Sequence, residues 1–253
     1  MLALSRFYVG AVLCSLLYHT STAQTPPATD PAAEAPPPSA EAPGGIREIS
    51  PGIVGIGEIR LDQKARTVTF PGAINMNQGL LEYLIVGPNG PTHESLLVTQ
   101  IRPVELHTIM LLLGVKGEKP PAGADAPPAQ LTREYLQHAP KLTGENLEIS
   151  VTWKDNKGAS KTVEVSDLLR NADSGKAVPR GPWTYSGSSF NADGKFLAQS
   201  EDVFGALVLN PSALINNPRK GNDDDRAWEA NQKATPAPKT PVTITLKVLE
   251  PKR

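Results

Sequence analysis

Residues 70–114 read FPGAINMNQGLLEYLIVGPNGPTHESLLVTQIRPVELHTIMLLLG and carry the densest structural signal in the chain. Two largely apolar runs, 80–87 and 92–99, flank the sequence Pro-Asn-Gly-Pro. Asn-Gly between such runs is the strongest short-range hairpin signal, so we expect the two runs to pair as antiparallel strands. Downstream, Pro103 can begin a helix and Gly114 can end one. The stretch therefore predicts a hairpin followed by a helix.

The predicted helix at 103–114 carries an apolar stripe of Leu106, Ile109, Met110 and Leu113, at positions i, i+3, i+4 and i+7. That spacing places the four side chains on one face, which we expect to pack on a sheet.

The rest of the chain continues in short alternating segments. Pairs of predicted strands lie at 58–61 with 67–70, at 146–153 with 161–165, and at 183–190 with 195–199; further strands lie at 203–209 and 242–249. Alternation of apolar and polar residues with turn signals between the segments is typical of hairpins. We therefore expect an α+β fold, a strand-rich single domain of successive β-hairpins with one principal helix packed on the sheet.

The N-terminal residues are typical of an exported protein. Residues 1–23 combine Arg6, an apolar run of about twelve residues and small residues before Gln24, which predicts a signal peptide cleaved near Ala23. Residues 24–45 are rich in proline and alanine and predict a disordered linker. We expect 46–253 to form one domain with a low-complexity loop at 116–130, and the protein to be periplasmic or extracellular.

Composition narrows the cofactors and partners. The only cysteine, Cys14, lies in the predicted signal peptide, so the processed chain has no thiolate for an iron-sulfur cluster. Composition does not exclude a bound divalent metal, because carboxylate and imidazole ligands remain in the processed chain. With 25 basic and 26 acidic residues, the chain gives no electrostatic reason to expect nucleic acid. No transmembrane segment is predicted after the signal peptide, so an unknown ligand or an envelope partner remains.

Three residues in the opening stretch are candidates for catalysis: Glu82, Glu94 and His107. On a regular strand His93 and Glu94 face opposite sides. In the predicted hairpin Glu82 lies opposite Leu97, about 13 Å along the sheet from His93, which is too far for a shared metal. We expect Glu94 to meet His107 if the helix packs on the face that Glu94 shares with Leu96 and Val98.

Two further groups invite a binding interpretation. Residues 222–225, Asn-Asp-Asp-Asp, are either a cation site or a solvated loop balanced by Arg219, Lys220 and Arg226. The tryptophans Trp183 and Trp228 are either a sugar-stacking platform or core anchors.

Several stretches together resemble the YdjY-type domain found in secreted bacterial proteins: 68–114, 149–158, 183–216, 223–228 and 241–246. The resemblance covers nearly all of 58–249 and implies a domain type and a location outside the cytoplasm. It assigns no role to individual residues. The matching positions that core packing does not explain are Asn75, Glu82, Glu94, His107, Asp225 and Trp228. Of these, Asn75, Asp225 and Trp228 are candidate ligand-binding residues.

The sequence favours a noncatalytic binding or envelope-associated module, because an exported domain on a linker shows no recognisable catalytic set. One alternative is a metal-assisted or acid-base hydrolase that uses Glu94 and His107 with either Glu82 or Asp225. Another is a carbohydrate-binding module built on Trp183 and Trp228.

Overall fold

A computed structural model describes residues 45–117 and 143–250. The predicted signal peptide at 1–23 lies outside these residues, as do the linker and the loop at 116–130 apart from Gly45, Lys116 and Gly117. No helix among the described residues is long and apolar enough to cross a bilayer.

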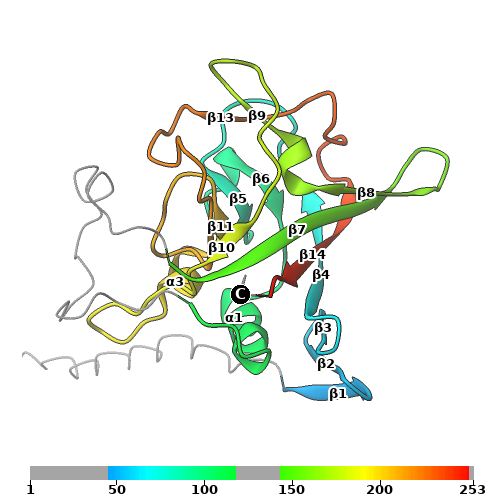
Figure 1. The fold of residues 1–253 in the computed structure, drawn as a ribbon, viewed down its shortest axis with the longest axis vertical. Coiled ribbons are helices and arrows are strands. Elements are labelled where there is room, and N and C mark those ends of the chain that lie inside the picture. The colour runs from blue at the N-terminus through cyan, green and yellow to red at the C-terminus, as the bar shows by residue number, and fades with distance from the viewer. Residues whose placement is uncertain (1–44, 118–142, 251–253) are drawn as a thin grey trace, which may run out of the picture. The chain divides into compact units, whose positions relative to one another are not determined.

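Eight strands close into a β-barrel (Figure 1). Each strand pairs with the next around the barrel, and β6 closes the ring by pairing with β4. In spatial order the strands are β4 (Thr67–Ile74), β14 (Pro241–Val248), β7 (Glu145–Lys154), β10 (Trp183–Tyr185), β12 (Ile215–Asn216), β11 (Val203–Ala206), β5 (Tyr83–Val86) and β6 (Ser95–Val98). Their apolar side chains fill one continuous core.

Strand β4 pairs with two different strands along the same edge. Its first half pairs with β3 (Ile59–Asp62), and its last residues pair with β6. Gly72 lies at the changeover, where an added Cβ would be 3.0 Å from the carbonyl oxygen of Val98. The missing side chain therefore lets β6 approach β4 closely enough to close the barrel.

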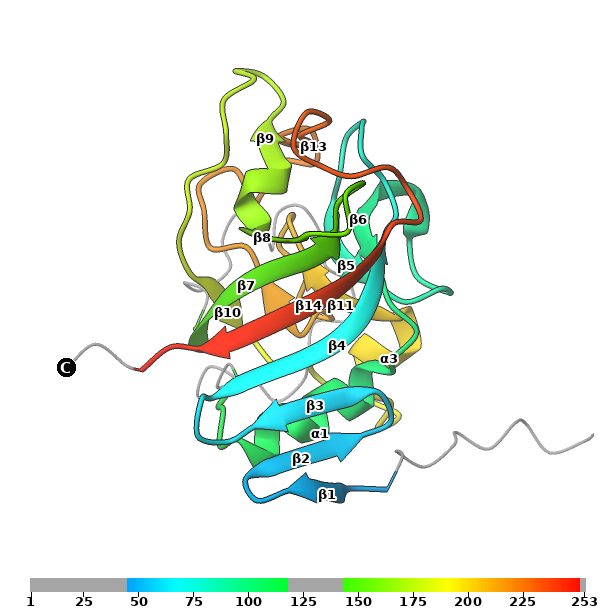
Figure 2. The same cartoon turned by 90° about the vertical axis from the view of Figure 1, so that its right-hand side faces the viewer.

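The sheet continues beyond the barrel on the β4 side. Figure 2 shows β3, β2 (Ile53–Ile56) and β1 (Arg47–Ser50) as successive antiparallel strands below β4. We call this part the extension, 47–62 together with the first half of β4. On the far side of the barrel, β8 (Ser160–Glu164) pairs with β7, and a separate two-stranded sheet joins β9 (Leu169–Asn171) to β13 (Trp228–Ala230).

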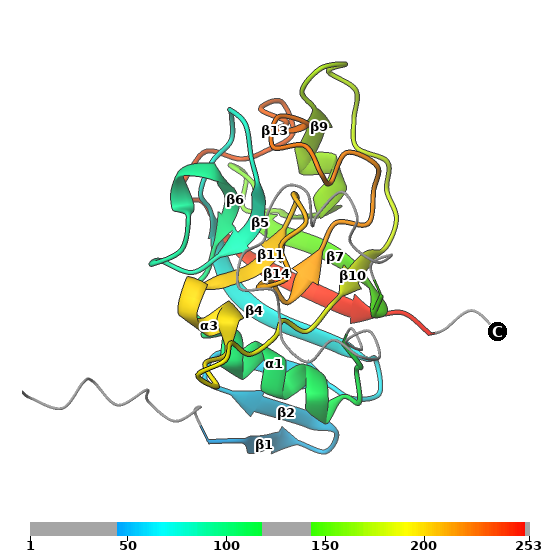
Figure 3. The same ribbon diagram turned by 90° about the vertical axis from the view of Figure 1, so that its left-hand side faces the viewer.

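Helix α1 (Pro103–Leu112) packs on one face of β2 and β3. Figure 3 shows it on the viewer's side of β2. Its residues Leu106, Ile109 and Met110 are buried, so the predicted apolar stripe is confirmed there. The other helix is the short α3 (Leu197–Glu201), and the 3-10 turns are η1 (Thr92–Glu94) and η2 (Val165–Leu168). α1 therefore caps the inner face of the extension and leaves its outer face uncovered by any described helix.

The predicted α+β class is wrong. The protein is a β-barrel with extra strands, and α1 is the only helix longer than two turns in the described part of the chain. Two predicted pairs are confirmed, β3 with β4 and β7 with β8. The unit predicted at 183–199 is confirmed only in part: β10 forms and one antiparallel bridge joins Phe190 to Phe196 across the turn, but residues 197–201 form α3 instead of a strand.

The hairpin predicted around Asn89-Gly90 is also wrong, since β5 and β6 run parallel, with Tyr83 beside Ser95. A tight type I′ turn needs positive φ at both central residues, and neither Asn89 nor Gly90 has it. The turn is instead held by Asp202, whose carboxylate accepts the amide of Asn89. Tertiary contacts therefore override the local turn signal.

Candidate functional site

Parallel pairing of β5 and β6 brings Glu82 beside Glu94, which the predicted hairpin had kept apart. The amide of Glu82 donates to the carbonyl oxygen of Glu94 at 3.0 Å. Burial raises the pKa of Glu82, and the carboxylates of Glu94 and Asp225 raise it further. His93 opposes this shift and lies 3.6 Å from the Glu94 carboxylate, because η1 replaces the expected strand. Three of the predicted site residues therefore form one acidic cluster.

Two more predicted residues support this cluster without joining it. The side-chain amide of Asn75 donates to the carbonyls of Thr92 and Ser95 and so fixes the turn that carries Glu94. The indole of Trp228 donates to the carbonyl of Gly221 at 3.0 Å and fixes the loop that carries Asp225. Among the described residues, no group of three or more His, Cys, Asp or Glu side chains has an arrangement that could hold a metal ion. The cluster can attract a cationic group electrostatically.

His107 lies elsewhere, and the expected contact with Glu94 is absent from the described structure. Its Nδ1 is 2.7 Å from the hydroxyl of Tyr185, and its ring is 4.9 Å from that of Phe196. Burial lowers the pKa of His107 and raises the pKa of Tyr185, so both groups are neutral at pH 7. A hydrolase that uses Glu94 and His107 together is therefore not supported.

The sugar-stacking platform predicted from Trp183 and Trp228 is wrong. Trp183 is fully buried and Trp228 is 3% exposed, so neither indole presents a face to a ligand. The guanidinium of Arg219 covers the Trp183 ring at 4.7 Å. These tryptophans are core anchors.

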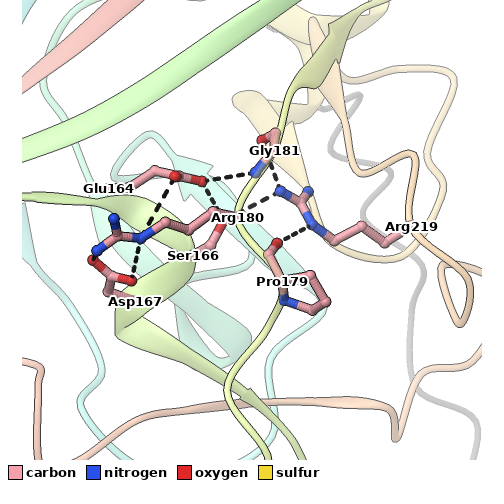
Figure 4. Close-up of polar contacts among 7 residues, drawn as sticks. All are labelled: Glu164, Ser166, Asp167, Pro179, Arg180, Gly181 and Arg219. Atoms are coloured by element: carbon pink, nitrogen blue, oxygen red, sulfur yellow. Dashed lines mark hydrogen bonds and ion pairs between the residues drawn. The ribbon is translucent and has the colours of Figure 1, made fainter.

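Arg219 belongs to a network of structural contacts, shown in Figure 4. Its guanidinium donates to the carbonyls of Pro179 and Gly181, at 2.9 and 2.8 Å, and to the side chains of Ser166 and Asn217, at 3.2 and 3.1 Å. Burial lowers the pKa of Arg219, and Glu164 opposes that shift. Arg219 therefore ties three loops together instead of balancing the acidic residues at 223–225.

The outer face of the extension contains a hollow of about 390 Å³ that sequence reasoning missed. The lining residues come from the four neighbouring strands β1 to β4: Ile49, Ser50, Ile53, Arg60, Asp62, Thr67 and Thr69. Register explains the set, since Ile53 lies beside Asp62 and Asp62 beside Thr67, while Arg60 lies beside Thr69. All five therefore point to the face opposite α1.

Gly55 lets Ile49 pack closely on β2. It pairs with Arg60 and is buried, because the Ile49 side chain occupies the space that a side chain here would fill. A Cβ at this position would lie 2.9 Å from the end of the Ile49 side chain, which reaches across from β1. The hollow thus has an apolar wall of Ile49 and Ile53 facing polar side chains of β3 and β4.

The guanidinium of Arg60 has no hydrogen-bond or ion-pair partner among the described residues, whereas Asp62 accepts the amide of Ala65 at 2.8 Å. The hydroxyls of Ser50, Thr67 and Thr69 are likewise not bonded to described residues. The only sequence signal was the alternation in 59–62 and 67–70, which is common to any half-exposed strand.

Comparison with known proteins gives the family. A search of curated proteins and a search of solved structures returned no match. The family model described as the YdjY domain matches residues 59–247, which is more than half of the chain. The chain therefore belongs to the YdjY domain family.

Proposed function

We propose that this protein is a noncatalytic binding module that holds a carboxylate-bearing ligand in the hollow of the extension. The observation that carries the proposal is the guanidinium of Arg60, which lies over a concave surface without a partner in the described chain. Ligand pockets commonly combine an apolar wall with a few convergent polar groups, and cavities of 300 to 1,000 Å³ are the usual size range. The hollow has both features.

The chemistry of Arg60 favours an anion. A guanidinium offers five donors in a planar fork that matches a carboxylate in two parallel hydrogen bonds. The neighbouring arginines make contacts within the domain: Arg47 donates one hydrogen bond to the carbonyl of Gly57, and Arg66 pairs with Glu145 and Glu250. Arg60 is the arginine of the extension that makes no hydrogen bond or ion pair to a described residue.

The remaining lining groups define how such a ligand would lie. The hydroxyls of Ser50, Thr67 and Thr69 can each donate and accept one hydrogen bond or more. Ile49 and Ile53 offer a surface for a short apolar portion. We also propose that the module works in the periplasm or outside the cell, on the strength of residues 1–23 alone.

Calorimetric titration of the chain from residue 24 with galacturonate and with lactate tests the proposal. Arg60→Ala should weaken binding by about ten- to a hundredfold, because hydrogen bonds to charged groups contribute about 1.5–3 kcal/mol. Arg60→Lys should give an intermediate loss, since an ammonium cannot form the paired bonds. Lys64→Ala, on the neighbouring turn, is the control for nonspecific charge and should bind as the unmutated protein does.

Asp62→Asn distinguishes the sign of the ligand. The substitution keeps an acceptor for the amide of Ala65 and removes a negative charge from the hollow. An anionic ligand should bind as well or more tightly, whereas a cationic ligand would bind more weakly. Binding of galacturonate that is insensitive to Arg60→Ala, or no binding of either carboxylate, would contradict the proposal.

A further inference from the structure

Two side chains of opposite charge lie next to each other in the hollow. Arg60 and Asp62 are two residues apart on β3, so both point to the outer face and their Cα atoms are about 6.6 Å apart. They form no ion pair with each other, and Asp62 uses one carboxylate oxygen to accept the amide of Ala65. The other carboxylate oxygen, like the guanidinium, has no partner among the described residues. The hollow therefore offers a ligand one positive and one negative group.

Apolar side chains flank this charge pair on the β2 side. Ile53 lies beside Asp62 in the register of β2 with β3, and Ile49 reaches over Gly55, which lies beside Arg60. Each charged residue therefore has an isoleucine as its neighbour on this side. A short apolar group placed there would cover part of both isoleucines, and removal of apolar surface from water favours binding.

Hydroxyl groups flank the charge pair on the β4 side. Thr69 lies beside Arg60, and Thr67 lies beside Asp62. A threonine hydroxyl both donates and accepts, so Thr69 can donate to an anion held at Arg60 and Thr67 can accept from a cation held at Asp62. The hydroxyls assist either charge, and the charge pair itself selects the ligand.

The charges beyond the hollow give an acidic ligand no net attraction. Lys247 lies beside Thr67, and Glu148 lies beside Lys247 on the next strand, so the two opposite charges are neighbours there as well. A ligand that carries only a carboxylate would bring it close to the carboxylate of Asp62, and like charges repel. A ligand that also carries an ammonium group would replace that repulsion with an attraction.

We propose that the ligand of the hollow is a free α-amino acid with an apolar side chain. Its carboxylate lies at Arg60, its ammonium group at Asp62 and its side chain against Ile49 and Ile53. The inference rests on the function proposed for the hollow and adds the class of ligand. An α-amino acid carries these three groups on one carbon, so one small molecule meets the positive, the negative and the apolar part of the lining.

Calorimetric titration of the chain from residue 24 with L-leucine and with 2-hydroxy-4-methylpentanoate tests the inference, because these ligands differ only in an ammonium group in place of a hydroxyl. Leucine should bind the unmutated protein about tenfold more tightly, since charge-assisted hydrogen bonds are stronger than neutral ones. Asp62→Asn should weaken leucine binding about tenfold and leave binding of the hydroxy acid unchanged or tighter. A general loss of folding cannot produce this difference between the two ligands.

The matched control is Glu148→Gln. It removes a negative charge from the same face of the sheet but outside the hollow, where Glu148 lies beside Lys247. It should leave the ratio of the leucine and hydroxy-acid affinities unchanged. A change in that ratio as large as that in Asp62→Asn would show that the net charge of the face, and not Asp62, selects the ligand, and the inference would be wrong.

Comparison of L-leucine with L-alanine tests the position of the apolar side chain. Leucine should bind about fivefold or more tightly, because its larger side chain covers more of Ile49 and Ile53. Ile53→Thr keeps a branched side chain on the strand and should reduce this advantage without changing the affinity for alanine. Equal affinities for leucine and alanine in the unmutated protein would contradict the inference.

The outcomes separate the two proposals. Equal affinities for leucine and its hydroxy acid, both lost in Arg60→Ala, would overturn the amino-acid inference and leave the proposed function standing. Leucine binding that survives Arg60→Ala would overturn both, as would leucinamide, which lacks the carboxylate, binding as tightly as leucine. Glycyl-leucine binding more tightly than leucine would show that the ligand is a peptide and that the amino-acid inference alone is wrong.

Discussion

Arg219 and Arg60 lie in two regions of one domain and differ in what their guanidinium groups contact. Arg219 donates four hydrogen bonds and covers Trp183, so it joins loops far apart in sequence. Arg60 stands on a regular strand beside a hollow, without a partner in the described chain. A charged group that uses four of its five donors within the protein holds the fold, whereas one whose donors remain is available to a ligand.

Arg219→Ala should give the largest effect on stability. The substitution leaves the carbonyls of Pro179 and Gly181 without this donor. It also removes the guanidinium bonds to Ser166 and Asn217 and uncovers the Trp183 ring. We expect a loss of about 3 kcal/mol in the free energy of unfolding, measured by urea denaturation. Arg180→Ala is the control, because its side chain is 68% exposed and its pairs with Asp167 and Glu164 are screened by solvent. Equal losses of stability in Arg219→Ala and Arg180→Ala would show that the internal hydrogen bonds of Arg219 do not stabilise the fold more than exposed ion pairs do.

Substitution of His107 should have an intermediate effect on stability, because one of its ring nitrogens forms a hydrogen bond with the hydroxyl of Tyr185. His107→Leu leaves the buried hydroxyl of Tyr185 without its partner, and we expect a loss of about 1–2 kcal/mol at pH 7.5. A larger loss of unfolding free energy in His107→Leu than in Arg219→Ala would contradict this order of effects on stability.

The pH dependence of stability gives a separate test of His107. Burial lowers its pKa below the ordinary value of about 6.5, so the unfolded chain binds the proton more tightly than the folded one. The stabilising contribution is fully present above about pH 6.5 and is lost as the pH falls toward the lowered native pKa. Urea denaturation between about pH 7.5 and 5 should show this slope in the unmutated protein and a flatter slope in His107→Leu.

Glu82→Gln should stabilise the protein slightly. The pKa of Glu82 is raised by burial and by Glu94 and Asp225, so its ionised form at pH 7 costs stability. That cost is absent below the unfolded pKa and appears as the pH rises through the native one. Because the cluster is partly exposed, we expect a gain of no more than about 0.5 kcal/mol at pH 7 and none near pH 3.5. A loss of stability at pH 7 would show that Glu82 makes a favourable ionic contact.

Arg60→Ala should have the smallest effect on stability, within about 0.5 kcal/mol, because it removes no contact to a described residue. The same variant should lose ligand binding, as set out above. A stability loss comparable to that of Arg219→Ala would show that Arg60 has a structural role and would remove the distinction between the two regions.

Local signals predicted the parts of the fold that depend on neighbouring residues. Alternation of apolar and polar residues predicted the pairs β3 with β4 and β7 with β8. Pro103 and the apolar stripe predicted α1. Barrel closure depends on contacts between distant segments, namely β6 on β4 at Gly72 and Asp202 on the turn at Asn89. No local pattern encodes those contacts, so the α+β class and the hairpin at 80–99 were wrong.

For the candidate site too, the sequence predicted individual residues but not the contacts between distant segments. Glu82, Glu94 and Asp225 were identified as residues, but their proximity follows from the parallel order of β5 and β6. Arg60 has the same sequence context as any outward residue of a strand. Its significance depends on the hollow that forms across β1 to β4, where Ile49 reaches over Gly55 from β1.

Ligand binding in the hollow is tested most directly by an amide chemical-shift titration of the 15N-labelled chain from residue 24 with galacturonate. We predict that the shifted amides cluster in β2, β3 and the first half of β4, around Ile53, Arg60 and Thr69, and that Arg60→Ala abolishes these shifts. Shifts centred on Glu82 and Glu94 or on His107, or an unchanged pattern in Arg60→Ala, would contradict this prediction.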